Sequence, residues 1–128
     1  MSYPQFEELQ VWQKARELAG GIHTQLASVS DSALADQLQR SSMYLMNNIA
    51  KGMERKGSTE FERFLYIARG YCGELKSSLY LAEDLGLIPT AQRESWHEDV
   101  ITVAKMLSGL LKSIYAKKDK AAAEEAVA

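Results

Sequence analysis

Two histidines and one cysteine are the side chains of this sequence whose chemistry could support catalysis or metal binding. Glu94 and His97 form a Glu-x-x-His pair, the spacing that places a carboxylate and an imidazole on one face of a helix in di-iron bundles. A di-iron centre needs a second such pair, and His23 has Gly20 where the glutamate would stand. Trp96 takes the position expected to face the core, which leaves Glu94 and His97 toward the rim. We therefore predict no metal site and no cofactor.

The remaining residues carry no signature of an enzyme. Cys72 falls on a ladder of core positions, so we expect it to act as a small buried hydrophobe rather than as a nucleophile. The glycines at 52, 57, 70 and 73 do not have the spacing of a phosphate-binding or dinucleotide-binding loop. The sequence predicts a protein that is not an enzyme.

The charge balance is weakly acidic but uneven. The 128 residues carry a net charge of −2, which argues against a general nucleic-acid binder. Residues 40–76 hold seven basic and four acidic side chains, a local net charge of +3. Two interpretations remain open: a solvated helix face, or a strip that binds nucleic-acid phosphates. The strip would comprise Arg40, Lys51, Arg55, Lys56, Arg63 and Arg69.

Cysteine usage and hydropathy predict a cytoplasmic protein. There is one cysteine, no signal peptide and no apolar run long enough to cross a membrane. We expect a reducing compartment and no membrane partner.

The helix expected over residues 59–86 organises the fold. Its apolar residues recur at alternating steps of four and three, which places them on one stripe of an α-helix. The two ladders are Phe61, Ala68, Leu75 and Ala82, and Leu65, Cys72, Leu79 and Gly86.

Three further helices are expected over residues 4–27, 33–54 and 90 to 115 or 117. Asp31 or Ser32 can cap the second helix and Gly57 can end it; Ser58, or Thr59 with Glu62 as a capping box, can begin the third. The short connections predict an all-α, antiparallel up-down-up-down four-helix bundle over residues 1–117. Residues 118–128 have no apolar stripe and are expected to form a flexible tail.

Aromatic residues off these stripes allow two interpretations. Tyr66, Tyr71 and Tyr80 are either absorbed by wide core stripes or belong to an oligomer interface. Gly70 and Gly73 on the same helix would let a partner helix approach closely.

Four ordered motifs carry a resemblance to a known family. They are Phe6-Glu7-Glu8-Leu9-Gln10-Val11-Trp12-Gln13-Lys14-Ala15, Asn48-Ile49-Ala50-Lys51-Gly52, Ser58-Thr59-Glu60-Phe61-Glu62-Arg63-Phe64-Leu65, and Glu74-Leu75 with Leu85-Gly86. Over residues 6–115 the chain resembles the bacterial four-helix bundle family, also called the S23 or ribosomal RNA intervening-sequence protein family. That family includes the accessory protein of diversity-generating retroelements. The family-motif positions of greatest interest are Asn48, Gly52, Glu60, Phe61 and Arg63. Asn48 is next to the apolar face of its helix, so we expect at least part of its amide to be buried and to find hydrogen-bond partners.

The resemblance implies an antiparallel bundle that assembles as a ring-like homopentamer and, for most members, no assigned activity. The retroelement accessory members are basic rings that bind a reverse transcriptase and nucleic acid. This chain departs from the family pattern at Lys51 and at Tyr71-Cys72. The leading hypothesis is a non-enzymatic, homo-oligomeric scaffold whose partner is itself; the alternative is a module that binds RNA or a ribonucleoprotein through the basic strip.

Overall fold

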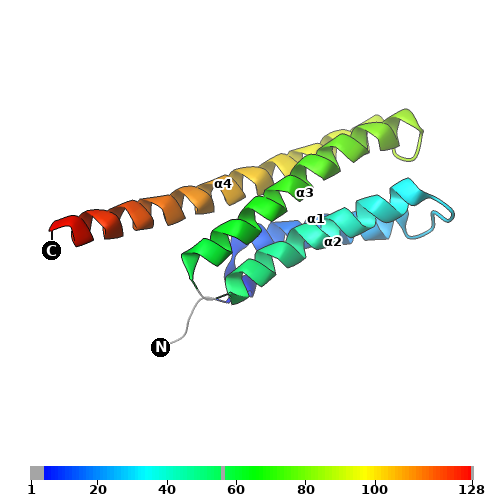
Figure 1. Cartoon of the computed structure of the whole chain (residues 1–128). Coiled ribbons are helices and arrows are strands. Elements are labelled where there is room, and N and C mark those ends of the chain that lie inside the picture. Colours follow the sequence, from blue (N-terminus) through cyan, green and yellow to red (C-terminus); the bar gives the residue numbers. More distant parts are fainter. Residues whose placement is uncertain (1–4, 56, 128) are drawn as a thin grey trace.

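The computed structural model describes residues 5–55 and 57–127. These residues form a short 3-10 helix η1 (Phe6–Glu8) and four α-helices, α1 (Gln10–Leu26), α2 (Ala33–Glu54), α3 (Ser58–Asp84) and α4 (Thr90–Val127), with no strand among them. Successive helices run in alternating directions, and α1 also packs against α4 (Figure 1). The protein is therefore the all-α four-helix bundle that the sequence predicts.

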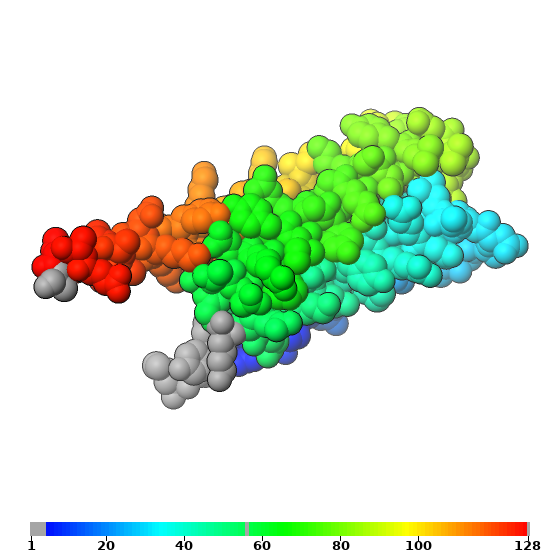
Figure 2. Space-filling model, in the orientation of Figure 1, coloured from blue at the N-terminus to red at the C-terminus, as the bar shows by residue number. Residues whose placement is uncertain are grey.

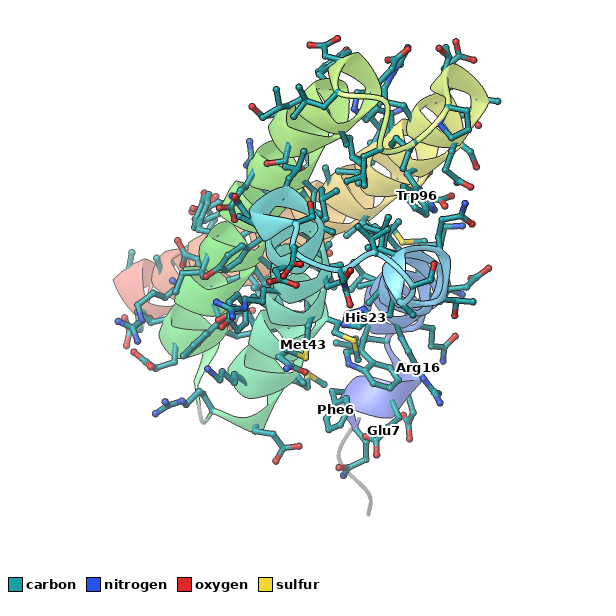
Figure 3. The ribbon with its side chains drawn as sticks, turned by 90° about the vertical axis from the view of Figure 1, so that its right-hand side faces the viewer. Phe6, Glu7, Arg16, His23, Met43 and Trp96 are labelled. Atoms are coloured by element: carbon teal, nitrogen blue, oxygen red, sulfur yellow. The ribbon has the colours of Figure 1, made fainter. Side chains whose placement is uncertain are left out.

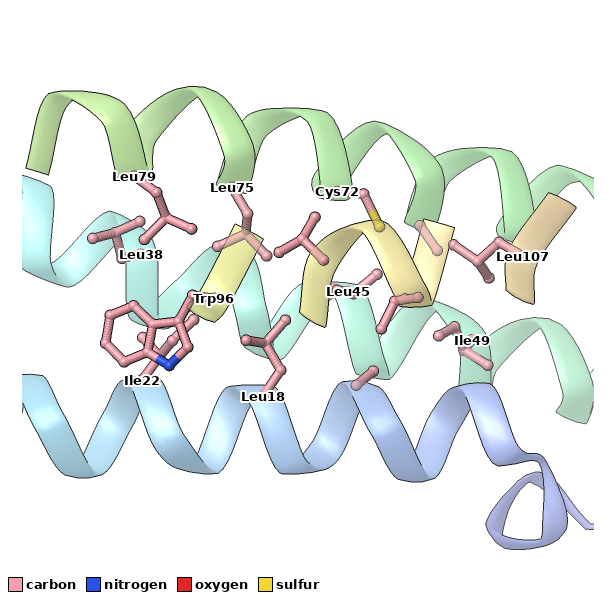
Figure 4. Close-up of a cluster of buried hydrophobic side chains, with 14 of the residues drawn as sticks. Leu18, Ile22, Leu38, Leu45, Ile49, Cys72, Leu75, Leu79, Trp96 and Leu107 are labelled. Atoms are coloured by element: carbon pink, nitrogen blue, oxygen red, sulfur yellow. The ribbon is translucent and has the colours of Figure 1, made fainter. Parts of the chain in front are cut away.

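The core follows the apolar ladders of α3. Six of the eight predicted positions are buried: Leu65, Ala68, Cys72, Leu75, Leu79 and Ala82. Phe61 packs half-buried against the core, and Gly86 lies beyond the helix in a left-handed conformation with φ 74°. Side chains from all four helices meet this stripe (Figure 4). Burial of this continuous stripe is what holds α3 between its neighbours.

The N-terminal helix differs from its prediction. The chain does not form one helix from residue 4, because Leu9 adopts an extended conformation between η1 and α1, and Pro4 lies outside the described residues. The Phe6 ring packs against Trp12 with ring centroids 5.0 Å apart. As a result Val11 is buried, whereas Trp12 is only half-buried.

The helix caps are partly as predicted. Ser32 caps α2, since its Oγ accepts a hydrogen bond from the Ala35 N–H at 3.1 Å. Helix α3 starts after Gly57, which has φ 98° and provides no side-chain cap, and α2 already ends at Glu54. The predicted capping box does not form, because the Glu62 carboxylate is bound to groups on α4.

Helix α4 is longer than predicted. The expected end was Tyr115 or Lys117, but the helix continues to Val127 and projects beyond the other helices (Figures 1 and 2). Residues 119–127 are all exposed. Alanine, lysine and glutamate dominate this stretch and favour helix without a buried face, so the absence of an apolar stripe did not end the helix.

Candidate functional site

Among the glycine positions, Gly52 at the α2–α3 turn marks the closest approach between two helices. A Cβ on Gly52 would lie 2.8 Å from the Phe64 Cβ and 3.1 Å from the Phe61 Cδ1, so only glycine fits without a shift of α3. The motif residue Gly52 therefore has a structural role, which is to let the first turns of α3 seat Phe61 and Phe64 against α2.

Asn48 lies one turn before Gly52 on α2. Its side chain is 8% exposed, and its Nδ2 donates a hydrogen bond to the Tyr44 carbonyl oxygen at 2.8 Å. The prediction that this amide is buried and finds a partner is confirmed. Glu60, another motif residue, lies half-buried in the first turn of α3.

The predicted basic strip is divided among different surfaces. Arg40 is exposed on α2 and lines a groove against α3, whereas the Arg69 guanidinium carbon lies 5.9 Å from the Tyr66 ring centroid. Lys51 and Arg55 are exposed at the end of α2. Lys56 lies outside the described residues.

The structure brings two strip residues onto one ring. The guanidinium carbon of Arg55 lies 5.2 Å from the Phe64 ring centroid, and that of Arg63 lies 5.1 Å from the same centroid. Phe64 is only 6% exposed, so the two arginines contact a ring held against the α2–α3 turn. The sequence predictions had not singled out Phe64, although a phenylalanine directly after an arginine and opposite Gly52 was the available signal.

A groove of about 430 Å³ runs between α2 and α3. Glu74 lies in it, where one carboxylate oxygen accepts a hydrogen bond from Gln37 Nε2 at 3.1 Å and the other accepts one from Ser41 Oγ at 3.0 Å. Tyr71, one of the predicted interface residues, lines this groove and packs its ring 5.6 Å from that of Tyr44.

Tyr66, the second predicted interface residue, belongs to a polar network between α3 and α4. The Tyr66 and Tyr115 hydroxyls share a hydrogen bond, and Tyr115 also donates to Glu62 Oε1 at 2.8 Å. The Lys118 ammonium donates to the other Glu62 oxygen. Hydrogen bonds from Lys118 and then Tyr115 lower the pKa of Glu62, so this carboxylate stays ionised.

Tyr80, the third predicted interface residue, is 52% exposed and covers a buried histidine. Its ring meets the His97 ring edge-on at a centroid distance of 4.5 Å, and the Arg93 guanidinium carbon lies 5.2 Å from the Tyr80 centroid. Arg93 Nε donates to Glu83 Oε1 at 2.7 Å. All three predicted tyrosines thus pack on a neighbouring helix while keeping part of their surface exposed.

His97 is not at the rim, as the sequence had suggested, but 6% exposed. Its Nε2 lies 3.0 Å from the Lys76 carbonyl oxygen and must donate the hydrogen, since a carbonyl only accepts. Burial is the largest cause of the lowered pKa of His97, and the hydrogen bond to the Lys76 carbonyl partly opposes this effect. Glu94, by contrast, extends into solvent beside Arg93, and within residues 5–55 and 57–127 no three histidine, cysteine or acidic side chains group together for a metal.

Cys72 is a buried thiol in the core. Burial raises its pKa to about 12, which keeps the thiol protonated near neutral pH. The prediction that Cys72 is a core residue is confirmed.

Comparison with known proteins agrees with the geometry. One similar solved structure is that of a protein of unknown function from the S23 ribosomal protein family of Bacteroides thetaiotaomicron. It is 24% identical, with a TM-score of 0.73, and the similarity covers 80% of this chain and 98% of that one. The two chains therefore share a helical-bundle fold. A comparison with curated proteins finds no match.

The family model for 23S rRNA-intervening sequence proteins matches residues 7–109 of the sequence, well over half of it. The chain belongs to the 23S rRNA-intervening sequence protein family. The resemblance recognised in the four sequence motifs is confirmed. No helix in the described ranges is both long and apolar enough to cross a membrane.

Proposed function

We propose that this protein is a non-enzymatic, self-assembling scaffold of the cytoplasm, and that its assembly is a homopentamer. The pentamer is the state that the family resemblance implies. A cytoplasmic location fits a chain whose one cysteine is a buried thiol.

The observation that carries this proposal is a second, exposed stripe on α3, opposite the core. Its residues recur at alternating steps of three and four, which keeps them on one face of the helix. This outer stripe comprises Ile67, Gly70, Glu74, Ser77 and Leu81. Large apolar side chains lie at its ends, and the small residues Gly70 and Ser77 lie between them on either side of Glu74, which is half-buried and bonded to α2. A partner helix could lie close to α3 at these two small residues.

The solvent-exposed area of the chain exceeds that of a compact monomer, which supports a surface that binds a partner. A compact folded monomer of 14.3 kDa exposes roughly 6,800 Å². This chain exposes 7930 Å². Part of the difference belongs to the projecting end of α4, and part to exposed apolar residues of α2 and α3. These are Met43, Tyr44, Tyr66, Ile67, Tyr80 and Leu81.

Native mass spectrometry of the wild type and of one charged variant tests the proposal. We expect a wild-type pentamer, and Leu81→Lys should dissociate it because the lysine charge would be buried against the partner helix. The control is Ile101→Lys, a change at another exposed apolar residue, on α4, which should leave the pentamer intact. A wild-type monomer at micromolar concentration would overturn self-assembly, and an intact Leu81→Lys pentamer would exclude the outer stripe as its interface.

A second candidate function is the binding of RNA or a ribonucleoprotein. It is favoured by positively charged side chains that form no ion pair with an acidic side chain. In the described part of the chain, Lys51, Arg55 and Arg63 form no ion pair within 4.0 Å. Filter binding of structured RNA over a range of salt concentrations tests this function. Retention that weakens with rising salt supports phosphate contacts, and no retention at low ionic strength rules the function out.

A further inference from the structure

Arg55 and Arg63 are distinguished from the other cations of the surface by sharing one aromatic ring. Each of their guanidinium carbons lies within 5.2 Å of the Phe64 centroid. Arg16 and Arg69 also lie over aromatic rings, but each has a ring to itself. Two positively charged groups thus share one aromatic support.

No carboxylate of the described chain neutralises this arginine pair. The cations that do find acidic partners do so elsewhere: Lys14 with Asp99, Arg93 with Glu83 and Glu94, and Lys118 with Glu62. Glu54 and Glu60 are close in sequence to the pair, yet neither lies within 4.0 Å of a guanidinium nitrogen. Glu62 is committed to α4 by its bonds to Lys118 and Tyr115.

The support under the pair is fixed. Phe64 is 6% exposed, and its Cβ is held where α3 passes Gly52 most closely. A guanidinium that lies over a ring keeps its N–H donors free at its edge, where they can bind an oxyanion. Because the Phe64 ring is covered, a ligand cannot stack on it. The ligand must therefore be bound by the N–H groups at the edges of the two guanidinium groups.

We propose that Arg55 and Arg63 form a binding site for a dianionic phosphate group at the α2–α3 turn. Two guanidinium charges match the charge of inorganic phosphate or a phosphate monoester near neutral pH, and oxygens of one phosphate can accept hydrogen bonds from both forks. A carboxylate, by contrast, carries a single negative charge, which one guanidinium group can match. The group can come from free phosphate or from the 5′-terminal phosphate of a nucleic acid. This site does not depend on self-assembly.

Isothermal titration calorimetry of the full-length protein at low ionic strength and about pH 7.5, where phosphate is mostly dianionic, tests the site. One arm uses inorganic phosphate, and the other compares a short RNA bearing a 5′-phosphate with the same RNA bearing a 5′-hydroxyl. We expect saturable binding of the phosphate or tighter binding of the 5′-phosphorylated RNA. The arm that gives the signal identifies the source of the phosphate.

Variants assign the binding to the pair. Arg55→Gln and Arg63→Gln should each weaken binding at least about tenfold, the loss of one charge-assisted hydrogen bond. Arg55→Lys should weaken it less, since it keeps the charge but loses the fork. Arg16→Gln, which removes an arginine over a single ring on α1, is the matched control and should bind as the wild type does. Circular dichroism verifies that each variant is folded.

The proposed site would be overturned by the absence of saturable binding in both arms, or by equal binding of acetate and phosphate. It would likewise be overturned if Arg16→Gln lost as much affinity as Arg55→Gln and Arg63→Gln. Equal affinity for the two RNAs, with no binding of inorganic phosphate, would also overturn it, because the contacts would then be to the RNA backbone. Native mass spectra of the same samples report the oligomeric state separately, so failure of this site is distinguishable from failure of self-assembly.

Discussion

His97 is the buried titratable residue whose environment most affects its charge. It lies under Tyr80, donates its Nε2 hydrogen to the Lys76 carbonyl of α3, and is near the positive charge of Arg93, one turn earlier on α4. Burial is the main cause of its lowered pKa. The unfolded chain therefore binds a proton more readily at this position than the folded one does.

This difference predicts a loss of stability in mild acid. A histidine with a lowered folded pKa contributes stability above its unfolded pKa of about 6.5, and that stability falls as the pH drops through the folded pKa. Urea unfolding between about pH 7.5 and 5 should show a falling midpoint, in a range above that in which the carboxylates of Glu62 and Glu83 become protonated.

The variant His97→Gln isolates this contribution, because glutamine can still donate to the Lys76 carbonyl but does not titrate. Its midpoint should change less with pH than that of the wild type. The matched control, His23→Gln, removes the other histidine, which contacts the Ala19 carbonyl on its own helix. An unchanged pH dependence in His97→Gln would show that another group is responsible.

At the scale of the helices, α2 and α3 can pass closely because Gly52 has no side chain. Gly52→Ala should destabilise the protein by about 1–3 kcal/mol, the cost of overpacking, even though alanine favours helix. The reason is that the added Cβ would meet Phe64 Cβ at 2.8 Å. The free energy of unfolding in urea measures the effect.

Gly20→Ala is the control for this substitution. Gly20 lies inside α1, where an added Cβ would meet nothing within 4 Å, so alanine should stabilise the helix by up to about 1 kcal/mol. Gly20 and Gly21 are adjacent within this helix. Helix α1 is continuous across them, and a Cβ added to Gly21 would meet only the Trp96 Nε1, at 3.7 Å. Equal effects of the two substitutions would refute a special role for Gly52.

Helix α4 should differ in stability along its length. Residues 100–114 pack on the core, whereas residues 119–127 are exposed and follow the contact of Lys118 with Glu62. Hydrogen exchange should show strong protection of the amides in the packed part and rapid exchange after Lys118. Protection that continues to Val127 would contradict this expectation.

At the scale of the whole molecule, assembly and phosphate binding make a joint prediction. A ring that repeats the arginine pair would bind an RNA with several phosphates more tightly than one subunit does, through avidity. Leu81→Lys should then weaken RNA retention but leave the affinity for inorganic phosphate unchanged, because the outer stripe and the pair are separate surfaces. Filter binding and calorimetry measure the two quantities. Equal RNA binding by monomer and ring would contradict avidity.

Local patterns in the sequence determined the architecture. The heptad ladders of α3 predicted which of its side chains are buried, Cys72 among them, because helical periodicity depends on neighbours three and four residues apart. The position of Trp96 on α4 was likewise predicted to face the core. The same local logic predicted the Ser32 cap and the buried amide of Asn48. The ordered motifs were sufficient to identify the family.

Only the tertiary structure decided which surface residues meet. Tyr66 and Tyr115 are 49 residues apart, and Glu62 and Lys118 are 56 apart, so no local pattern relates them. The cations of the basic strip look alike in sequence, yet among those that the structure describes only Arg55 and Arg63 come to share a ring. Their meeting depends on how closely α3 passes Gly52, and that distance is set by packing between helices rather than within them.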